Sequence, residues 1–340
     1  MARVLVTGAS GFIAQHVILQ LLEAGHEVRG TARSATKGEA LKGHLAAHDP
    51  RGRELQVFEA DLSRDAGWAD AVAGCDYVQH VASPIPATLP KDHDELIKPA
   101  RDGALRVLRA ASDAGVKRCV MTSSMAAAAY GWGDALPSPI HEEHWSNPDN
   151  LQDNTAYTRS KTIAERAAWK FIEESDAALE LSVINPTAVL GPALGPSASV
   201  SLELVGFPLK GKLPAVPDIG FPIVDVRDVA RAHVLAMEEN AAAGERFLVG
   251  EEYLNFADVV KILRQEFPDY RGKLSTRRMP SWLLRFMALF SGELKQTVTE
   301  LGKQRRTTNE KAKKLLGWTP RPAREAVVAA AQSLIDYKLI

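Results

Sequence analysis

Tyr157 and Lys161 are the two residues whose types and spacing could most directly do chemistry. They stand four residues apart in a stretch that predicts a helix, so both side chains lie on one helical face. A free phenol has a pKa of about 10, and an adjacent ammonium lowers it. The pair can therefore act as an acid catalyst if a cofactor and a third polar group lie beside it. Without them, the spacing indicates only a solvated helix face.

The N-terminal segment predicts a strand, a glycine turn and a helix. Val4 to Thr7 are strand-like, Gly8 and Gly11 form the turn, and the helix ends at Gly25. Glycine lets the main chain approach a ligand closely, and the helix N-terminus supplies free N–H groups. Ala14 replaces a third glycine and is small enough for helix-to-strand packing. The alternative is a tight turn alone, but the pattern favours a pyrophosphate site.

Arg33 ends the second predicted strand, His26 to Ala32. In dinucleotide-binding sheets the residue at this place meets the adenosine ribose, and an arginine there suits a 2′-phosphate. Arg33 therefore predicts NADPH as the cofactor, with Lys37 and Lys42 adding positive charge. The alternative is a solvated arginine at a strand end.

Further strands alternate with helical stretches, which predicts an α/β fold with a doubly wound parallel sheet. These strands are Leu55 to Ala60, Cys75 to Val81, Arg118 to Met121 and Leu181 to Asn185. Ligands bind beyond the carboxyl ends of such strands, where Asp61, Ser83, Ser124 and Thr187 follow. Asp61 could accept from an adenine amino group or cap a helix.

The last third predicts a second, discontinuous and mostly helical domain. Glycine and proline become frequent from Ala188, and the chain returns to the first domain at Ile223 to Val226. We expect a dinucleotide-binding domain at 1–187 plus 222–250 and a substrate or lid domain at 188–221 plus 251–340. Leu190, Val200 and Leu204 could line the pocket or pack under a lid. Predicted helices lie around Phe256 to Phe267, Ser281 to Phe290, Asn309 to Leu316 and Ala323 to Tyr337.

Composition is that of a globular protein, with 46% hydrophobic and 24% charged residues and a net charge of −1. That charge gives no global attraction to nucleic acid or membranes. Cys75 and Cys119 are too far apart for a metal pair and predict core thiols in a cytoplasmic protein. The basic clusters at Arg277-Arg278, Lys303 to Arg306 and Lys311 to Lys314 predict helix faces turned to water. We expect no metal, no nucleic acid and no membrane partner, and either a monomer or a homodimer.

Several motifs occur in the order found in one family. They are Gly8-x-x-Gly11-x-x-Ala14, His80-Val81-Ala82-Ser83-Pro84, Thr122-Ser123-Ser124, Tyr157-x-x-x-Lys161 and Pro186-Thr187-x-x-x-Gly191-Pro192. The segments Val224 to Ala230 and Asn309 to Trp318 extend the match over the whole chain. The sequence resembles extended short-chain dehydrogenase/reductases with a Rossmann-type fold, in particular the dihydroflavonol 4-reductase-like branch.

The resemblance implies roles for the matching positions. Tyr157 would be the general acid for a carbonyl oxygen, Lys161 would lower its pKa and hold the nicotinamide ribose, and Ser124 would hydrogen-bond the same oxygen. The implied cofactor contacts are Gly8, Ser10, Gly11, Phe12, Ile13, Arg33, Lys37, Asp61, Leu62, Val81, Ala82, Ser83, Thr122, Tyr157, Lys161, Pro186 and Thr187. The implied substrate contacts are Pro84, Ser124, Met125, Tyr157 and Leu190.

Two differences from the family's plant enzymes narrow the substrate. Ala129 stands where dihydroflavonol reductases carry the asparagine that recognises the flavonoid, and Asn154 to Thr158 replace the Asn-Trp-Tyr-Cys-Tyr motif of cinnamoyl-CoA reductases. We therefore expect an NADPH-dependent reductase of a small to medium aldehyde or ketone. The alternatives are an NAD-dependent nucleotide-sugar epimerase or dehydratase, which Arg33 disfavours, and a dinucleotide-sensing protein without turnover, which the intact Tyr157, Lys161 and Ser124 disfavour.

Overall fold

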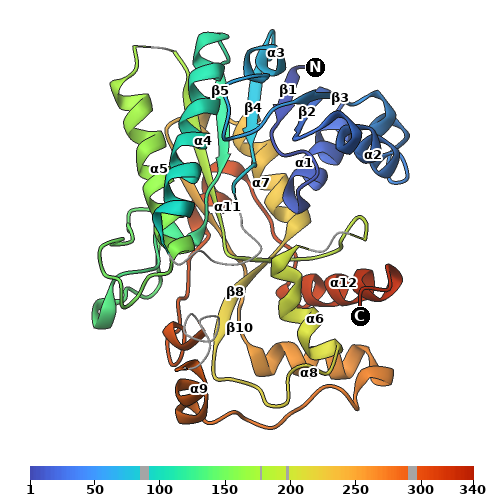
Figure 1. The fold of residues 1–340 in the computed structure, drawn as a ribbon, viewed down its shortest axis with the longest axis vertical. Helices are drawn as coiled ribbons and strands as arrows, with labels where there is room; N and C mark the ends of the chain where they lie inside the picture. Colours follow the sequence, from blue (N-terminus) through green and yellow to red (C-terminus); the bar gives the residue numbers. More distant parts are fainter. Residues whose placement is uncertain (85–91, 177, 197–198, 290–296) are drawn as a thin grey trace.

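A seven-stranded parallel sheet forms the larger part of the molecule (Figure 1). The computed structural model describes residues 1–84, 92–176, 178–196, 199–289 and 297–340. The strand order is β3-β2-β1-β4-β5-β6-β9, with every neighbouring pair parallel. The strands are β1 (Arg3–Val6), β2 (Glu27–Ala32), β3 (Gln56–Glu59), β4 (Tyr77–His80), β5 (Arg118–Thr122), β6 (Glu180–Pro186) and β9 (Arg246–Val249). The predicted doubly wound fold is confirmed, and the strand order reverses between β1 and β4, where such sheets bind ligands.

Helices cover both faces of this sheet. One face packs against α1 (Phe12–Glu23), α2 (Ala35–Leu45), α7 (Val226–Glu238) and α11 (Glu310–Leu316). The other packs against α3 (Trp68–Val72), α4 (Asp94–Asp113) and α5 (Ala156–Glu174). Every residue of β5 is consequently buried, which explains its continuous apolar run rather than an alternating one.

The second domain lies at the carboxyl edge of the large sheet, in the lower half of Figure 1. It contains a three-stranded sheet in the order β10-β8-β7, which we did not predict. Its strands are β7 (Ala188–Leu190), β8 (Gly220–Asp225) and β10 (Tyr253–Asn255). Its helices are α6 (Glu203–Leu209), α8 (Phe256–Glu266), α9 (Ser281–Ala288) and α12 (Ala323–Asp336). Phe290, the expected end of α9, lies outside the described residues.

The predicted return to the first domain comes slightly later than expected. β8 pairs with β7 and β10, so residues 222–225 belong to the small sheet, and the chain rejoins the large sheet with α7. Asp228 of α7 accepts a hydrogen bond from Arg321 N at 2.7 Å, and its carbonyl accepts one from Trp318 Nε1 at 2.8 Å. The two C-terminal family motifs therefore hold each other and tie α7 to the end of the chain.

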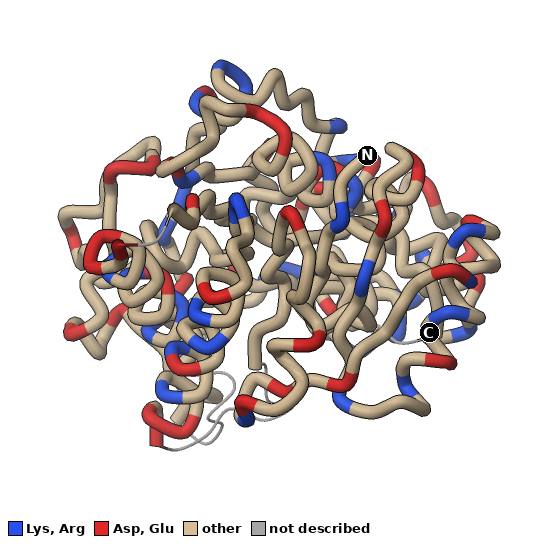
Figure 2. Tube along the Cα trace, turned by 90° about the horizontal axis from the view of Figure 1, so that it is seen from above, with Lys and Arg blue, Asp and Glu red and all other residues tan. Residues whose placement is uncertain are grey.

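Charges of both signs are spread along the whole trace (Figure 2). No helix among the described residues is long and apolar enough to cross a membrane. Within the same ranges, no group of His, Cys, Asp and Glu could hold a metal ion. Cys75 and Cys119 are both free and buried, as predicted for core thiols.

Candidate active site

The glycine turn after β1 is shaped for close approach. Gly8 has a φ of +63°, and a Cβ placed there would lie 2.9 Å from the Cβ of Ala82 after β4. Gly8 N donates to Thr31 Oγ1 at 3.0 Å, which ties the turn to β2. No side chain caps α1 at Gly11, and its first turn carries no acidic residue. The N–H groups at this helix end are therefore not occupied by a capping side chain, and a pyrophosphate site at this position remains a prediction.

Arg33 and Lys37 lie at the carboxyl end of β2 and the start of α2. Both side chains are exposed, and Ser34 caps α2 by accepting from Lys37 N. Asp61, after β3, accepts from Ser63 N at 2.8 Å and Ser63 Oγ at 2.7 Å, which lowers the pKa of its carboxyl. The positive charge of Arg33 contributes to that shift. The exposed arginine and lysine fit the phosphate of an NADPH adenosine.

Ser124 is held immediately after β5. Its Oγ accepts from Ala126 N at 3.1 Å and caps a short 3-10 turn at Met125–Ala127. Met125 is buried and belongs to the apolar cluster on which Tyr157 packs. The local turn therefore fixes both the Ser124 hydroxyl and Met125, whose side chain belongs to the cluster on which the Tyr157 ring packs.

Tyr157 lies in the first turn of α5. Thr155 and Thr158 form a reciprocal capping box, and Thr158 Oγ1 also donates to Asn154 Oδ1 at 3.0 Å. Thr155 is thus the N-cap of α5. This capped end sets the position of the phenol, whose pKa is raised by burial and, to a smaller extent, lowered by the Ser124 hydroxyl.

The electrostatics of the Tyr157 and Lys161 pair differ from our expectation. Burial raises the pKa of Tyr157, and the hydrogen bond with Ser124 opposes that shift. Lys161 is buried one turn further on, with its Nζ 5.9 Å from the Tyr157 ring centroid, and burial lowers its pKa to about 8. The pKa of the phenol is raised overall rather than lowered as expected, because the cost of burying a phenolate prevails. The phenol therefore keeps its proton at neutral pH, as an acid catalyst must.

The other predicted cofactor residues follow the strands of the same edge. Val81, Ala82 and Ser83 follow β4 and are partly buried, and Pro84 comes next. Thr122 ends β5 and shares a 2.8 Å hydrogen bond with His233 Nε2. Pro186 ends β6, and the Thr187 hydroxyl donates to the carbonyl of Val249. Leu62 turns toward Gly103 of α4, so its side chain packs in the core.

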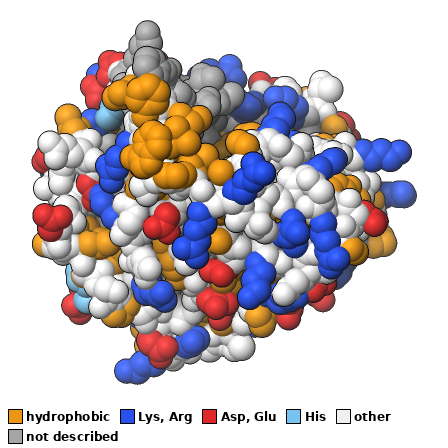
Figure 3. All heavy atoms as spheres, turned by 90° about the horizontal axis from the view of Figure 1, so that it is seen from below, with side chains coloured by type: hydrophobic (Ala, Val, Ile, Leu, Met, Phe, Trp, Pro, Cys, Tyr) orange, Lys and Arg blue, Asp and Glu red, His pale blue; other side chains and the backbone are white. Residues whose placement is uncertain are grey.

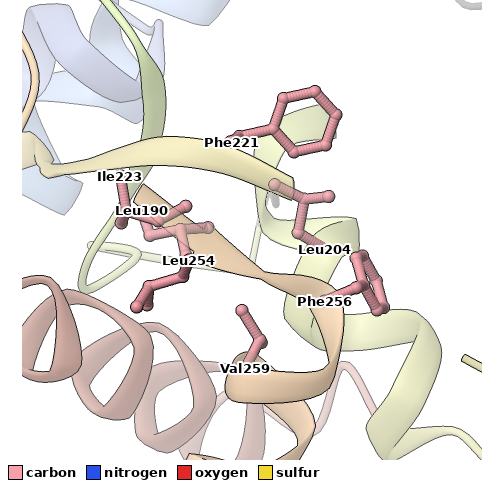
Figure 4. Close-up of a pocket in the computed structure, with 7 residues that line it drawn as sticks. All are labelled: Leu190, Leu204, Phe221, Ile223, Leu254, Phe256 and Val259. Carbon is pink, nitrogen blue, oxygen red and sulfur yellow. The ribbon is translucent and has the colours of Figure 1, made fainter. Parts of the chain in front are cut away.

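Leu190, the predicted substrate contact, lies away from this cluster. It is fully buried in the core of the second domain and lines a small cavity with residues of β8, β10, α6 and α8 (Figure 4). The cavity has a volume of about 10 Å³ and an apolar lining. A void of that size and polarity stays dry, so it is a packing defect rather than a substrate pocket.

A larger hollow of about 460 Å³ lies on the outer side of the second domain. Its lining includes Lys261, Arg264, Arg271 and Arg278, and many Lys and Arg side chains gather on the lower face of the molecule (Figure 3). Arg264 and Arg271 donate to each other's carbonyl oxygens, so backbone groups of this segment hold two of these side chains in place. Arg278 is exposed, as predicted for its cluster.

The prediction that the basic cluster Lys303 to Arg306 faces water is partly wrong. Arg305 is buried, with a side chain 2% exposed, and its Nη2 lies 2.6 Å from Asp153 Oδ1. Lys303 pairs with the same carboxylate, and Arg305 stacks 4.0 Å from the Tyr130 ring centroid. Asp153 also accepts from Gly131 N at 2.8 Å. The C-terminal segment therefore anchors the loops beside α5, a contact that local charge pattern could not reveal.

Sequence reasoning also missed a buried polar layer behind the catalytic residues. His80 shares a hydrogen bond with Thr7 Oγ1 at 3.0 Å, and His233 one with Gln79 Oε1 at 2.8 Å. Burial lowers the pKa of each histidine to about 3. Glu165 is fully buried on α5, four residues after Lys161. That spacing was a signal in the sequence, since Tyr157, Lys161 and Glu165 share one helical face.

Known proteins resemble this chain over most of its length. Tetraketide alpha-pyrone reductase 2 of Arabidopsis thaliana is 37% identical, covering 79% of this chain and 84% of that protein. A putative NADPH-dependent methylglyoxal reductase of Candida albicans is 35% identical, covering 80% and 84%. The crystal structure of yeast methylglyoxal/isovaleraldehyde reductase Gre2 complexed with NADPH matches with a TM-score of 0.81, 29% identity and 99% coverage of both chains.

These findings confirm the resemblance drawn from the motifs, since the relatives are reductases with the same fold. The family model described as "NAD dependent epimerase/dehydratase family" matches residues 4–250. The chain belongs to the NAD dependent epimerase/dehydratase family, the extended short-chain dehydrogenase/reductases, and the relatives named above are reductases of this family.

Proposed function

We propose that this protein is an NADPH-dependent reductase that converts the carbonyl group of a small to medium aldehyde or ketone to an alcohol, with Tyr157 as the general acid. The observation that carries the proposal is the Tyr157 ring packed on Met125, the residue after Ser124, with the buried Lys161 side chain one helical turn away and its Nζ 5.9 Å from the ring centroid. These groups lie on the sheet edge that also carries the Gly8 turn and Arg33.

The residues of this edge suit each part of the cofactor. The turn residues Gly8, Ser10, Gly11, Phe12 and Ile13 would hold the pyrophosphate at the uncapped end of α1. Arg33 and Lys37 would hold the 2′-phosphate, with Asp61 and Leu62 beside the adenine. The strand-end residues Val81, Ala82, Ser83, Thr122, Pro186 and Thr187 would surround the nicotinamide half. NADPH, when bound, supplies the hydride that reaches the carbonyl carbon.

The protein's own residues supply the proton and stabilise charge. The Ser124 hydroxyl donates a hydrogen bond to the carbonyl oxygen, and Tyr157 transfers its phenolic proton to that oxygen as negative charge develops. Lys161 then stabilises the phenolate by its positive charge, and solvent returns the proton. One hydride and one proton are added, so the product is an alcohol.

The residues near Ser124 favour a small to medium substrate over a flavonoid-sized one. Ala129 is fully buried, and its carbonyl is held by Arg305, so this position presents no polar side chain to a flavonoid-sized ligand. Pro84 and Met125 remain the proposed substrate contacts beside Ser124 and Tyr157. Methylglyoxal and isovaleraldehyde, which appear in the names of relatives, are small carbonyl compounds of the expected class.

A panel assay tests this function. Loss of reduced-nicotinamide absorbance is followed with methylglyoxal, isovaleraldehyde, larger aldehydes, ketones and α-keto esters, each with NADPH and NADH in parallel. We expect turnover of several small carbonyl compounds and preference for NADPH. No turnover with any compound would contradict the proposal, and NAD retained through purification would instead support the epimerase alternative.

We further expect a cytoplasmic protein that is a monomer or homodimer and binds no nucleic acid. Two free, buried thiols suit a reducing compartment. The net charge of −1 gives no global attraction to nucleic acid.

A further inference from the structure

Glu165 is a fully buried carboxylate at the centre of the molecule's catalytic half. Its oxygens lie 2.5 Å from Ser123 Oγ, 2.7 Å from Asn185 Nδ2 and 2.7 Å from Arg246 Nε. Trp169 Nε1, on the same helix, is 3.4 Å away. Ser123 directly follows β5, and the other partners lie in β6, β9 and α5, so one side chain ties the helix of Tyr157 and Lys161 to two strands and to the end of a third. Burying a carboxylate is costly unless it is paired in this way.

The bonds of Glu165 lead directly to Ser124. Ser123 precedes Ser124 in the chain, and Asn185 Nδ2 donates to the Ser124 carbonyl at 3.1 Å as well as to Glu165. The residue before Ser124 therefore bonds directly to Glu165, and the carbonyl of Ser124 accepts from Asn185, which also bonds to Glu165. Removing its carboxylate would release the peptide that presents the Ser124 hydroxyl to Tyr157.

Arg246 gives Glu165 a fixed counter-ion. Its guanidinium stacks 3.9 Å from the Trp145 ring centroid, and Nη1 donates to the carbonyls of Glu142 and His144 at 3.0 Å each. Arg246 is 6% exposed, so the ion pair is shielded from solvent. A pair held this firmly keeps the carboxylate in one place beside the strand ends.

Glu165 also acts on Lys161 through charge. It lies one turn beyond Lys161 on α5, and its negative charge raises the pKa of that ammonium against the larger effect of burial. From β4, His80 faces the same ammonium, but burial keeps this histidine neutral, with a pKa of about 3. Arg246 faces Glu165 from β9. Among the described groups, Glu165 is therefore the anion that supports the buried Lys161 cation.

We infer that Glu165 is a positioning residue for the active site, which fixes the Ser123-Ser124 peptide and places a buried carboxylate one helical turn from Lys161. The inference rests on the proposed reductase function. It predicts two separable effects, one on geometry through Ser123 and Asn185 and one on charge through Lys161.

The test compares variants that separate these effects. Glu165→Gln removes the charge. Ser123→Ala removes one hydrogen bond to Glu165, and Asn185→Ala removes one to Glu165 and one to the Ser124 carbonyl, whereas both leave the charge in place. Glu165→Gln leaves Arg246 buried without its carboxylate partner, so Glu165→Gln/Arg246→Met removes the ion pair as a unit and preserves folding better. Each variant is assayed for kcat and for KM of NADPH, and the Lys161 ammonium is titrated by NMR in lysine-labelled protein, with its signal assigned by Lys161→Met.

We expect Glu165→Gln and the double variant to lower kcat by about 10- to 100-fold, with little change in KM for NADPH. Their Lys161 titration should move to lower pH by about one unit. Ser123→Ala and Asn185→Ala should lower kcat by a smaller factor and leave the Lys161 titration at its wild-type midpoint. A role in packing alone would lower the thermal midpoint of unfolding without moving that titration.

An unchanged Lys161 midpoint in folded Glu165→Gln or in the double variant would overturn the charge effect. Wild-type kcat in both Ser123→Ala and Asn185→Ala would overturn the geometric effect, even if the glutamate variants failed to fold. Absence of turnover by the wild-type protein is a different result. It would contradict the proposed function, while the NMR titration would still decide whether Glu165 supports the Lys161 cation.

Discussion

At the scale of single residues, burial shifts the pKa values of the proton donor and of the neighbouring lysine in opposite directions. Burial favours the neutral form of both Tyr157 and Lys161. For the phenol this preserves the proton that the carbonyl oxygen must receive. For the lysine it brings the pKa down to about 8, close enough to neutrality that pH controls its charge.

This shift predicts how activity depends on pH. Lys161 is cationic below its pKa of about 8 and neutral above it, so kcat for carbonyl reduction should fall as pH rises through that value. A pH profile of kcat measures the decline. In Lys161→Arg, whose guanidinium stays charged, the decline should disappear although kcat is lower. A decline that persists unchanged in Lys161→Arg would assign it to another group.

Arg33 sets the cofactor preference in our account. Its exposed guanidinium would make charge-assisted hydrogen bonds to the 2′-phosphate, each of which contributes about 1.5 to 3 kcal/mol. Arg33→Ala should therefore raise KM for NADPH by about 10- to 100-fold and leave KM for NADH nearly unchanged. Arg109→Ala, an exposed arginine on α4, is the matched control. Equal effects of Arg33→Ala on both cofactors would reject the phosphate contact.

At the scale of elements, α5 is the part that the rest of the fold must place. Its N-terminus is fixed by its own capping box and by the loop at Asp153, which Arg305 and Lys303 hold from the C-terminal segment. Those cations, with their hydrogen bonds, lower the pKa of Asp153 although burial opposes the shift. The second domain thus helps to position the catalytic helix of the first.

Removing Arg305 should therefore destabilise the protein strongly. Arg305→Met leaves Asp153 buried with only Lys303 as a charged partner, which should cost about 3 kcal/mol in the free energy of unfolding. Denaturant unfolding measures this change. The exposed neighbour serves as the control, since Arg306→Ala should change stability by no more than about 0.5 kcal/mol. Similar small effects of both variants would show that the buried pair contributes little.

The elements also show what the sequence could predict. Strands with continuous apolar runs, such as β1 and β5, and the capped start of α5 were predictable because their signals are local. β8 was assigned to the wrong sheet, because an apolar run does not show which strand will pair with it. Arg305 was predicted to face water, because its partner Asp153 lies far away in the chain and only the fold brings them together.

At the scale of the whole molecule, two domains meet along the carboxyl edge of the large sheet (Figure 1). His16 on α1 and His48 after α2 each reach the segment that enters the second domain, sharing hydrogen bonds of 3.0 Å and 2.8 Å with the carbonyls of Pro192 and Leu194. Burial lowers the pKa of His16 to about 4. These contacts tie the nucleotide-binding helices to the second domain.

Buried neutral histidines predict sensitivity to acid. His16, His80 and His233 have pKa values of about 4, 3 and 3, below the ordinary value of 6.5, so the unfolded chain binds more protons than the folded one as pH falls below 6.5. Each should reduce the free energy of unfolding by up to about 1.4 kcal/mol per pH unit. Urea unfolding across this range should show the loss, and His233→Gln should make it less steep. If the free energy of unfolding of His233→Gln depends on pH as steeply as that of the wild-type protein, His233 does not contribute to the acid sensitivity.

The measurement that tests the central claim most directly is the turnover of Tyr157→Phe, which deletes only the phenolic oxygen. NADPH binding, followed by fluorescence, should match that of the wild-type protein, because the aromatic ring still packs on Met125 and its neighbours. We expect kcat for carbonyl reduction to fall by about 100- to 10,000-fold. Turnover of Tyr157→Phe at the wild-type rate would contradict the assignment of Tyr157 as the general acid.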